Sequence, residues 1–313
     1  MGRALTLVAA IVMTPALALV AQQPARFRSS IDTVEVQVTV RAADGTLVRD
    51  LTGDDFEIDD NGRRREITVF SGDVQPLTVA VLVDRSGSVD EKAAEVTAVA
   101  EAFVGALRRD DRASMSTLSW DCEPFTSDKA RLTAILRADT QADIGSPVWP
   151  ALDRMLGTLE REAGRRAVLL LSDGDNYLRP LRPAVAERFP GPCRYAADHT
   201  TATLDEVVDR AVGGGTMVYV VTVDIAGVET RDAELRRLAR ESGGERYRLS
   251  READLPGVFR RIADELHHQY LLGFVPDAFD GKRHDLAVHV KRPGVTVRAR
   301  RSYVATRLPC PPR

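Results

Sequence analysis

Apolar residues form two uninterrupted runs in the middle of the chain, one at Val79–Val83 and one within Arg165–Leu171. A strand with one exposed face alternates apolar and polar residues, so an unbroken run indicates a strand buried on both faces. From Pro76 to about Leu271, further strands such as Met217–Val223 alternate with segments of helical periodicity such as Leu204–Val212. This order predicts an α/β, Rossmann-like domain with a doubly wound, mostly parallel sheet.

Both flanks of this region have the pattern of antiparallel strands. Every second residue from Val34 to Val40 is valine, as in a half-buried strand. Asp60–Gly62 predicts a hairpin that joins strands at Phe56–Ile58 and Ile67–Phe70. Behind the α/β region, three strands are expected at Tyr270–Val275, His284–Lys291 and Val295–Tyr303. Each flank is small and would leave strand edges open, so we expect both chain ends to build one β-rich annex.

The first residues have the layout of a secretory signal peptide. Arg3 precedes an almost wholly apolar stretch, Ala4–Val20, and small residues make cleavage after Ala18 or Ala21 plausible. A retained anchor is the alternative, although the stretch is near the lower length limit for spanning a membrane. Since no later segment approaches that length, we expect an exported protein, periplasmic or extracellular, with no integral membrane span after signal cleavage.

The expected organisation therefore has four parts. Residues 1–21 form the signal peptide, 31–75 the N-terminal β segment of the annex, 76–269 the α/β domain and 270–306 the C-terminal β segment of the annex.

The charge balance gives no electrostatic case for nucleic acid as a partner. The chain has 43 Lys and Arg against 46 Asp and Glu, a formal net charge of -3. Two local basic runs, Arg63–Arg65 and Arg298–Arg301, interrupt alternating patterns. We interpret them as solvated strand faces and not as binding patches.

Oxygen-bearing side chains follow the first buried strand at every second position, at Asp84, Ser86 and Ser88. Asp173 follows the second all-apolar strand, and Ser146 precedes a helix. Loops after parallel strands emerge at the same edge of the sheet, so these residues can converge there. Oxygen ligands suit a hard divalent cation, magnesium first. The alternative is that they are turn and helix-capping residues, since such residues are common before helices.

In combination, Asp84-x-Ser86-x-Ser88, Ser146 and Asp173-Gly174 resemble the metal-ion-dependent adhesion site of von Willebrand factor type A domains. The chain also resembles a bacterial subgroup of exported proteins with such a domain. That resemblance rests on three flanking segments, Val48–Ile58, Gln269–Phe274 and Val290–Gly294.

The resemblance implies a role for each of the five residues. Ser86 and Ser88 would bind the metal through their hydroxyls, and Asp84 and Asp173 would bind it directly or through water. Ser146 stands where the family has a threonine. The implied cofactor is Mg²⁺, with Mn²⁺ or Ca²⁺ as alternatives, and an open coordination position would accept a carboxylate from a protein partner.

The leading hypothesis is therefore a non-enzymatic adhesion or binding protein, with no catalytic residues. A cell-envelope scaffold with a weak or vestigial metal site is the first alternative, and a metal-assisted hydrolase is the second. Against an enzyme, the five histidines lack metal-ligand spacing, and neither Gly-x-Ser-x-Gly nor His-Glu-x-x-His occurs.

Three cysteines, Cys122, Cys193 and Cys310, are too widely spaced for a zinc site. Cys122 follows the second strand of the α/β region and Cys193 lies after the fourth, so both belong on the edge that carries the metal residues. We expect a disulfide between these two in an exported protein, with Cys310 free or intermolecular.

Overall fold

The computed structural model describes residues 33–84, 101–118, 120–122, 125–137, 145–172, 177–178, 193–195, 201–223, 229–249 and 255–306. The chain divides into two compact units, Met1–Ser30 and Ile31–Arg313, and the described residues all belong to the second. The expected signal peptide lies outside the described residues. So do Ser86, Ser88, Asp173 and Cys310.

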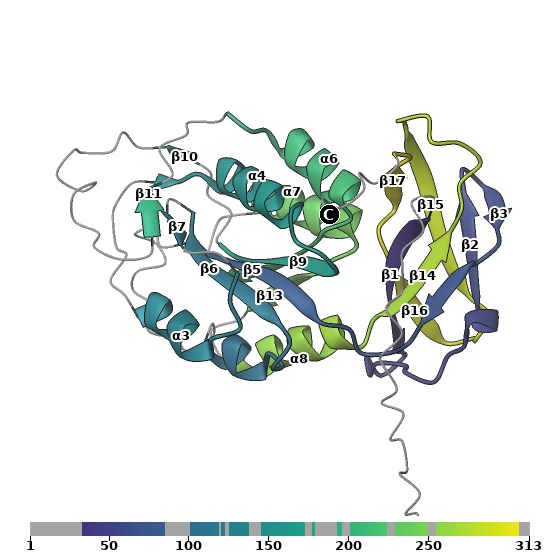
Figure 1. Ribbon diagram of the computed structural model, residues 1–313, viewed down its shortest axis with the longest axis horizontal. Coiled ribbons are helices and arrows are strands. Elements are labelled where there is room, and N and C mark those ends of the chain that lie inside the picture. Colours follow the sequence, from purple (N-terminus) through teal and green to yellow (C-terminus); the bar gives the residue numbers. More distant parts are fainter. Residues whose placement is uncertain are drawn as a thin grey trace, which may run out of the picture. The chain divides into compact units, whose positions relative to one another are not determined.

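A five-stranded parallel sheet forms the centre of the α/β region, in the order β13-β12-β9-β5-β6 (Figure 1). All seven residues of β5 are buried, and in β9 only one of seven is partly exposed. The prediction of strands covered on both faces is therefore confirmed. The strands are β5 (Leu77–Val83), β6 (Arg112–Thr117), β9 (Arg165–Leu171), β12 (Met217–Val223) and β13 (Arg246–Leu249).

Helices cover both faces of this sheet, which gives two separate hydrophobic cores (Figure 1). On one face, Phe103 from the helical residues 101–106 meets Phe259 of α8 edge to face, with ring centroids 6.2 Å apart. The other face packs against α4, α6 and α7. The predicted α/β, doubly wound architecture is thus confirmed. The helices are α3 (Lys129–Arg137), α4 (Val148–Leu159), α6 (Leu204–Gly214), α7 (Glu229–Ser242) and α8 (Leu255–His267).

Two four-stranded sheets form the annex, in the orders β16-β1-β14-β4 and β17-β15-β2-β3. Strands from the two chain ends pair directly, β1 with β14 and β16, and β2 with β15. The prediction that both ends build one annex is confirmed. The strands are β1 (Val34–Ala42), β2 (Phe56–Asp60), β3 (Arg63–Arg65), β4 (Val69–Ser71), β14 (Tyr270–Phe274), β15 (Arg283–Val290), β16 (Val295–Arg298) and β17 (Ser302–Val304), and a short 3-10 helix, η1 (Gly53–Asp55), precedes β2.

The predicted hairpin partner was wrong. The turn at Asn61–Gly62 joins β2 to the basic strand β3, and not to Ile67–Phe70. Arg63–Arg65 can follow the turn directly because carboxylates of β2 lie opposite, and Arg64 pairs with Glu57 at 2.5 Å. The segment with Val69 pairs instead with β14 in the other sheet. The interpretation of this basic run as a strand face is confirmed.

The last predicted strand, Val295–Tyr303, is also divided. β16 pairs with β1 and β17 pairs with β15, so the strand changes sheets between them. This break turns two arginines inward. The side chain of Arg298 is only 23% exposed, and burial lowers the pKa of Arg300 to about 10. The expectation that the whole run Arg298–Arg301 is a solvated strand face was therefore wrong.

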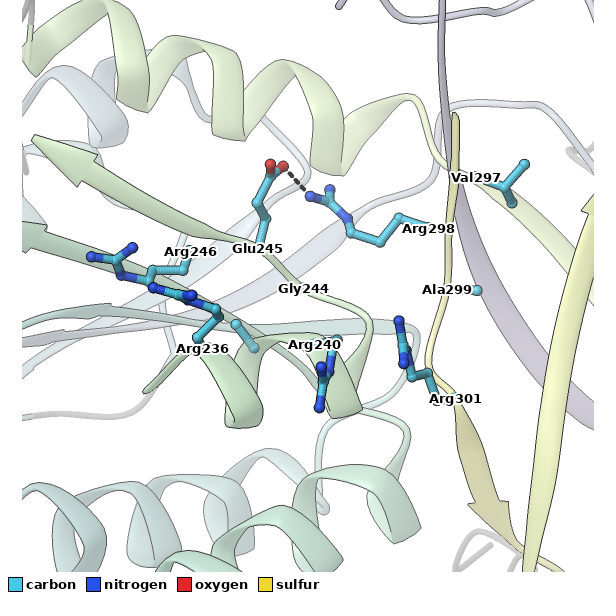
Figure 2. A pocket seen from close by; sticks show the side chains of 10 residues that line it. Arg236, Arg240, Gly244, Glu245, Arg246, Val297, Arg298, Ala299 and Arg301 are labelled. Carbon is cyan, nitrogen blue, oxygen red and sulfur yellow. Dashed lines mark hydrogen bonds and ion pairs between the residues drawn. The ribbon is translucent and has the colours of Figure 1, made fainter. Parts of the chain in front are cut away.

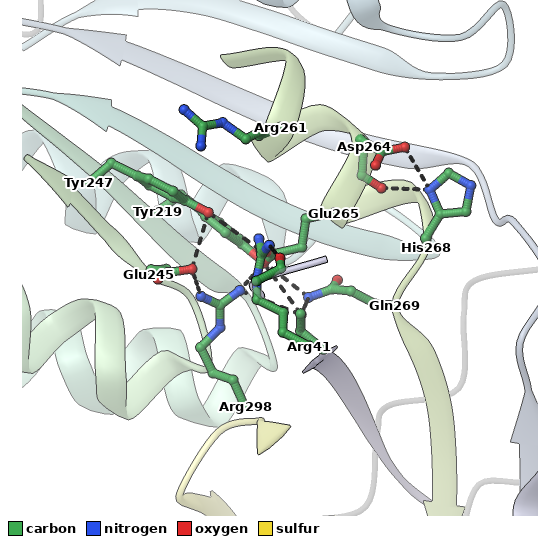
Figure 3. Close-up of polar contacts among 12 residues, drawn as sticks. Arg41, Tyr219, Glu245, Tyr247, Arg261, Asp264, Glu265, His268, Gln269 and Arg298 are labelled. Carbon is green, nitrogen blue, oxygen red and sulfur yellow. Dashed lines mark hydrogen bonds and ion pairs between the residues drawn. The ribbon is translucent and has the colours of Figure 1, made fainter. Parts of the chain in front are cut away.

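A buried carboxylate, Glu265 of α8, collects polar side chains from the sheet and the annex (Figure 3). Tyr219 of β12 donates its hydroxyl to Glu265 at 2.5 Å. Arg41 of β1 and Arg298 of β16 form ion pairs with the same carboxylate. We call Glu265 and its partners the Glu265 cluster; the partners are Thr39, Arg41, Tyr219, Tyr247 and Arg298. The cluster ties the annex strands to α8 and β12.

A second set of polar contacts joins the start of β9 to the end of α8. Arg165 is 2% exposed, and its guanidinium donates to the carbonyls of Leu266 at 2.5 Å and Gln269 at 3.1 Å. Carbonyls at a helix C-terminus lack partners within the helix, so this side chain caps α8. Burial lowers the pKa of Arg165 to about 10, because it disfavours the charged form. The cap fixes the point at which the chain leaves α8 for the annex.

Candidate metal site at the carboxyl edge of the sheet

The carboxylate of Asp84 lies directly after β5 and is only 1% exposed. The amide of Asp84 donates to the carbonyl of Leu171 in β9 at 2.8 Å, which extends the parallel pairing by one residue. Ser172, directly after β9, donates its hydroxyl to Asp84 Oδ2 at 2.8 Å. The ends of two neighbouring strands are thus joined through side chains.

A third segment contributes Ser146, which is fully buried. Its hydroxyl donates to Asp84 Oδ1 at 2.9 Å. Ser146 lies in β8 (Gly145–Ser146), and Pro147 follows at the N-cap of α4, where a missing backbone N–H costs nothing. β8 pairs with β10 (Tyr177–Leu178), so Tyr177 lies opposite Ser146. Three loops of the carboxyl edge therefore meet at one carboxylate.

The chemistry of these groups fits a hard divalent cation. A buried carboxylate is costly unless it accepts hydrogen bonds, and both oxygens of Asp84 do so. A hydroxyl that donates its single proton still has lone pairs to offer. The oxygens of Ser146 and Ser172 can therefore face a cation while both hydroxyls still donate hydrogen bonds to Asp84. Carboxylate and hydroxyl oxygens are ligands of the type that Mg²⁺ accepts.

Of the five residues predicted from the sequence, the structure brings Asp84 and Ser146 into contact. Ser86, Ser88 and Asp173 lie outside the described residues, so their roles stay predictions. Ser172 was missed by sequence reasoning. A hydroxyl residue directly between an all-apolar strand and Asp173 was the signal that could have identified it.

The two cysteines predicted to pair are brought opposite each other by the backbone. β7 (Trp120–Cys122) and β11 (Cys193–Tyr195) form an antiparallel pair in which Cys122 and Cys193 are register partners. Residues directly opposite in such a pair have Cα atoms about 4.5–5.5 Å apart, a separation that a disulfide spans. The backbone is thus compatible with the predicted bond, which stays a prediction.

Within the described part of the chain, no group of three or more His, Cys, Asp or Glu side chains could hold a metal ion. The candidate site consists mainly of serine hydroxyls, which are not among those residue types, and Asp173 lies outside the described residues. The buried His267 bonds to Asp111 at 2.6 Å. Asp111 also accepts from the amide of Leu77, at the start of β5 and therefore at the opposite edge of the sheet. This imidazole thus lies away from Asp84.

Comparisons with known proteins give structural likeness only. No family model matches the chain, and no curated protein matches it. The chain is similar to a solved von Willebrand factor type A protein from Catenulispora acidiphila, with 12% identity and a TM-score of 0.48 over 89% of this chain and 75% of that one. The sequence motif that begins at Asp84 resembles the metal site of the same kind of domain.

Two longer proteins are also similar in structure. The pilus adhesin SpaC from Lactobacillus rhamnosus GG shares 11% identity, with a TM-score of 0.44 over 79% of this chain and 47% of that one. Proximal thread matrix protein 1 from the mussel byssus shares 14%, with a TM-score of 0.45 over 65% and 49%. The chain thus spans about half the length of these two proteins. Likeness at this level concerns the fold, so the case for a site rests on the residues themselves.

None of the described helices is both long enough and apolar enough to cross a bilayer.

Proposed function

We propose that this chain is an exported binding protein that uses a divalent cation, Mg²⁺ first, to hold a protein partner. One observation carries the proposal: the buried carboxylate of Asp84 accepts hydroxyls from Ser146 and Ser172, which arrive from two other loops of the same sheet edge. If Asp84 were only a helix-capping or turn residue, it would need no contact with the loops that carry Ser146 and Ser172. The arrangement supports the ligand set predicted from the motif, Asp84, Ser86, Ser88, Ser146 and Asp173.

The proposed ligands favour holding a partner over catalysis. Three of the five are serines, and neutral hydroxyls offset little of the charge of the cation. The bound ion would remain electrophilic and would retain a position for an external oxygen, such as a carboxylate of the partner. Asp84 would orient the hydroxyl of Ser146, and its negative charge would attract the ion.

We propose that the protein performs this function after export, in the periplasm or outside the cell. The apolar stretch Ala4–Val20 supports it through its signal-peptide layout. The opposite positions of Cys122 and Cys193 also support it, because disulfides persist in oxidising compartments. The bond would fasten the segment with Cys193 to β7.

The test is partner capture by cross-linking from an extract of the source cells, with Mg²⁺ or with EDTA. Ser88→Ala removes one proposed ligand and leaves the contacts of Asp84 with Ser146 and Ser172 untouched. Ser127→Ala, at an exposed serine before α3, is the matched control. We expect the wild type and the control to capture a partner only with Mg²⁺, and Ser88→Ala to capture at least about tenfold less.

Equal capture in Mg²⁺ and EDTA would contradict the proposal and favour the scaffold with a vestigial site. Metal-dependent turnover of a phosphoester panel, lost in Ser88→Ala, would instead favour the hydrolase.

A further inference from the structure

The hydroxyl of Ser172 belongs to none of the five ligand positions predicted from the sequence, yet it contacts one of them directly. Ser172 is 3% exposed and donates to Asp84 Oδ2 at 2.8 Å. Ser146 donates to the other carboxylate oxygen, Oδ1, at 2.9 Å. Each oxygen of Asp84 is therefore held from a different segment of the chain. Rotation of the carboxylate about its Cβ–Cγ bond would misalign both hydrogen bonds.

Backbone hydrogen bonds fix the position of Ser172 itself. Its amide donates to the carbonyl of Val221 in β12 at 3.2 Å, and the amide of Asp84 donates to the carbonyl of Leu171 in β9 at 2.8 Å. The hydrogen bonding of β5, β9 and β12 thus continues up to Asp84 and Ser172. Residues held by a sheet are placed more precisely than residues in a loop, so Ser172 presents its hydroxyl to Asp84 from a fixed point.

A fixed carboxylate suits some cations better than others. Mg²⁺ demands near-ideal octahedral coordination at about 2.0–2.1 Å, whereas Ca²⁺ accepts about six to eight oxygens at about 2.3–2.6 Å in flexible arrangements. A carboxylate whose orientation is set before the cation arrives therefore favours the smaller ion, whether it contacts that ion directly or through water. A carboxylate that rotates readily would suit the larger ion as well.

We propose that Ser172 is a positioning residue that makes the candidate site select Mg²⁺ over Ca²⁺. The inference rests on the proposed cation site and concerns the hydrogen bond from Ser172 to Asp84. Removal of a group that orients a metal ligand typically changes metal affinity about 10- to 100-fold. Loss of the Ser172 hydroxyl would let the carboxylate of Asp84 rotate more readily, which costs Mg²⁺ more than Ca²⁺.

The test is calorimetric titration of Mg²⁺ and, separately, of Ca²⁺ into the metal-free full chain. Ser172→Ala removes the hydroxyl, and Ser172→Thr keeps it. We expect Ser172→Ala to bind Mg²⁺ about tenfold more weakly and to lose less affinity for Ca²⁺, so that the preference for Mg²⁺ falls. Ser172→Thr should keep the preference of the wild type.

Ser242 provides the matched control, because it is also 3% exposed and also uses its hydroxyl in the interior. It donates to the carbonyl of Ala239 and accepts from the amide of Val218, each at 3.0 Å. Ser242 is the last residue of α7, and Figure 2 shows this end of the helix, marked by Arg240 and Gly244, beside the annex. Since Val218 lies near the start of β12, the control is at the opposite edge of the sheet from the candidate metal site.

Ser242→Ala should lower the stability to urea about as much as Ser172→Ala does, and should bind both cations like the wild type. Equal fold losses of Mg²⁺ and Ca²⁺ affinity in Ser172→Ala, equal effects of the two alanine variants, or loss of the preference in Ser172→Thr would overturn the role of Ser172 and leave the proposed cation site standing. No saturable Mg²⁺ binding by the wild type would overturn the cation site and this inference with it.

Discussion

Tyr219 is fully buried within the Glu265 cluster, and burial raises the pKa of its hydroxyl to about 12. In an unfolded chain, the same hydroxyl ionises near pH 10. Between these values the folded state binds more protons than the unfolded state, so the contribution of Tyr219 to stability is full below pH 10 and is lost as the pH rises towards 12.

Tyr219→Phe tests this by removing the titrating group. The difference in unfolding free energy between the wild type and the variant should shrink as the pH rises above 10, by up to about 2–3 kcal/mol at pH 12. Urea titrations at pH 8, 9.5 and 11 measure it. A difference that stays constant over this range would show that the hydroxyl is not desolvated as described.

The roles of some individual residues could be predicted from the sequence, and the roles of others could not. Asp84 and Ser146 could be predicted because each belongs to a short motif beside a recognisable strand or helix. Glu265 could not, because nothing in the helical pattern of α8 distinguishes it from a solvated glutamate. Its partners Thr39 and Arg298 lie 226 and 33 residues away. Only the folded chain brings these charges together.

At the scale of elements, the turn between α7 and β13 depends on Gly243. This residue has a φ of 84°, and a Cβ on it would meet the backbone of Arg300 at 2.6 Å. Gly243→Ala should therefore add a steric clash to the strain of a left-handed conformation, and should cost about 3 kcal/mol or more. Urea unfolding measures the loss.

Gly281→Ala is the matched control for Gly243→Ala. Gly281 has a similar φ of 72°, and no other part of the chain lies within 4 Å of the position that a Cβ would take. The control substitution should cost only the backbone strain, about 1–2 kcal/mol. Equal losses for the two variants would show that the annex backbone does not approach Gly243.

The pairing of β7 with β11 leads to a prediction about the cysteines. Non-reducing peptide mapping of the chain produced in an oxidising compartment should recover a Cys122–Cys193 peptide, because the two positions are register partners. Reduction should lower the unfolding temperature, since a closed loop constrains the unfolded chain. A peptide that contains Cys310 joined to either residue would contradict the assignment.

The bounds of elements with a strong hydrophobic pattern could be predicted well from the sequence. Arg165–Leu171 and Met217–Val223 have the same bounds in the prediction and in the structure. The pairing partners in the annex were less predictable. An arginine-rich segment such as Arg63–Arg65 has little strand propensity by itself and becomes a strand because Glu57, Asp59 and Asp60 lie across from it. Such an interaction between strands cannot be predicted from the residues of the segment alone.

At the scale of the whole described unit, the Glu265 cluster joins the annex to the α/β sheet. Glu265→Gln would remove the buried carboxylate that Arg41 and Arg298 share, and the side chains of these arginines are only 25% and 23% exposed. Removal of one partner of a buried ion pair typically costs about 3–5 kcal/mol, so we expect a loss of that size in urea unfolding. We also expect the annex and the sheet to unfold in one transition, because both depend on the cluster.

The adjacent residue on the same helix provides the control. Asp264 pairs with Arg49, and both side chains are 48% exposed. Asp264→Asn should cost less than about 1 kcal/mol, since exposed ion pairs contribute little. Similar losses for the two variants would contradict the role assigned to Glu265.

The two edges of the sheet thus carry different contacts. Near the amino ends of the strands, Tyr219 of β12 shares Glu265 with the annex residues Arg41 and Arg298. The carboxyl ends carry Asp84 with Ser146 and Ser172. A change at the candidate metal site can therefore be made without disturbing the contacts that hold the annex.

Calorimetric titration of Mg²⁺ into the metal-free chain tests whether Asp84 belongs to a divalent-cation site. The wild type should bind Mg²⁺ saturably at a single site. Asp84→Asn, which keeps the shape of the side chain and removes its charge, should bind at least about tenfold more weakly with an unchanged circular dichroism spectrum. Equal Mg²⁺ affinities of wild type and variant, or no saturable binding by the wild type at millimolar Mg²⁺, would show that Asp84 does not belong to such a site.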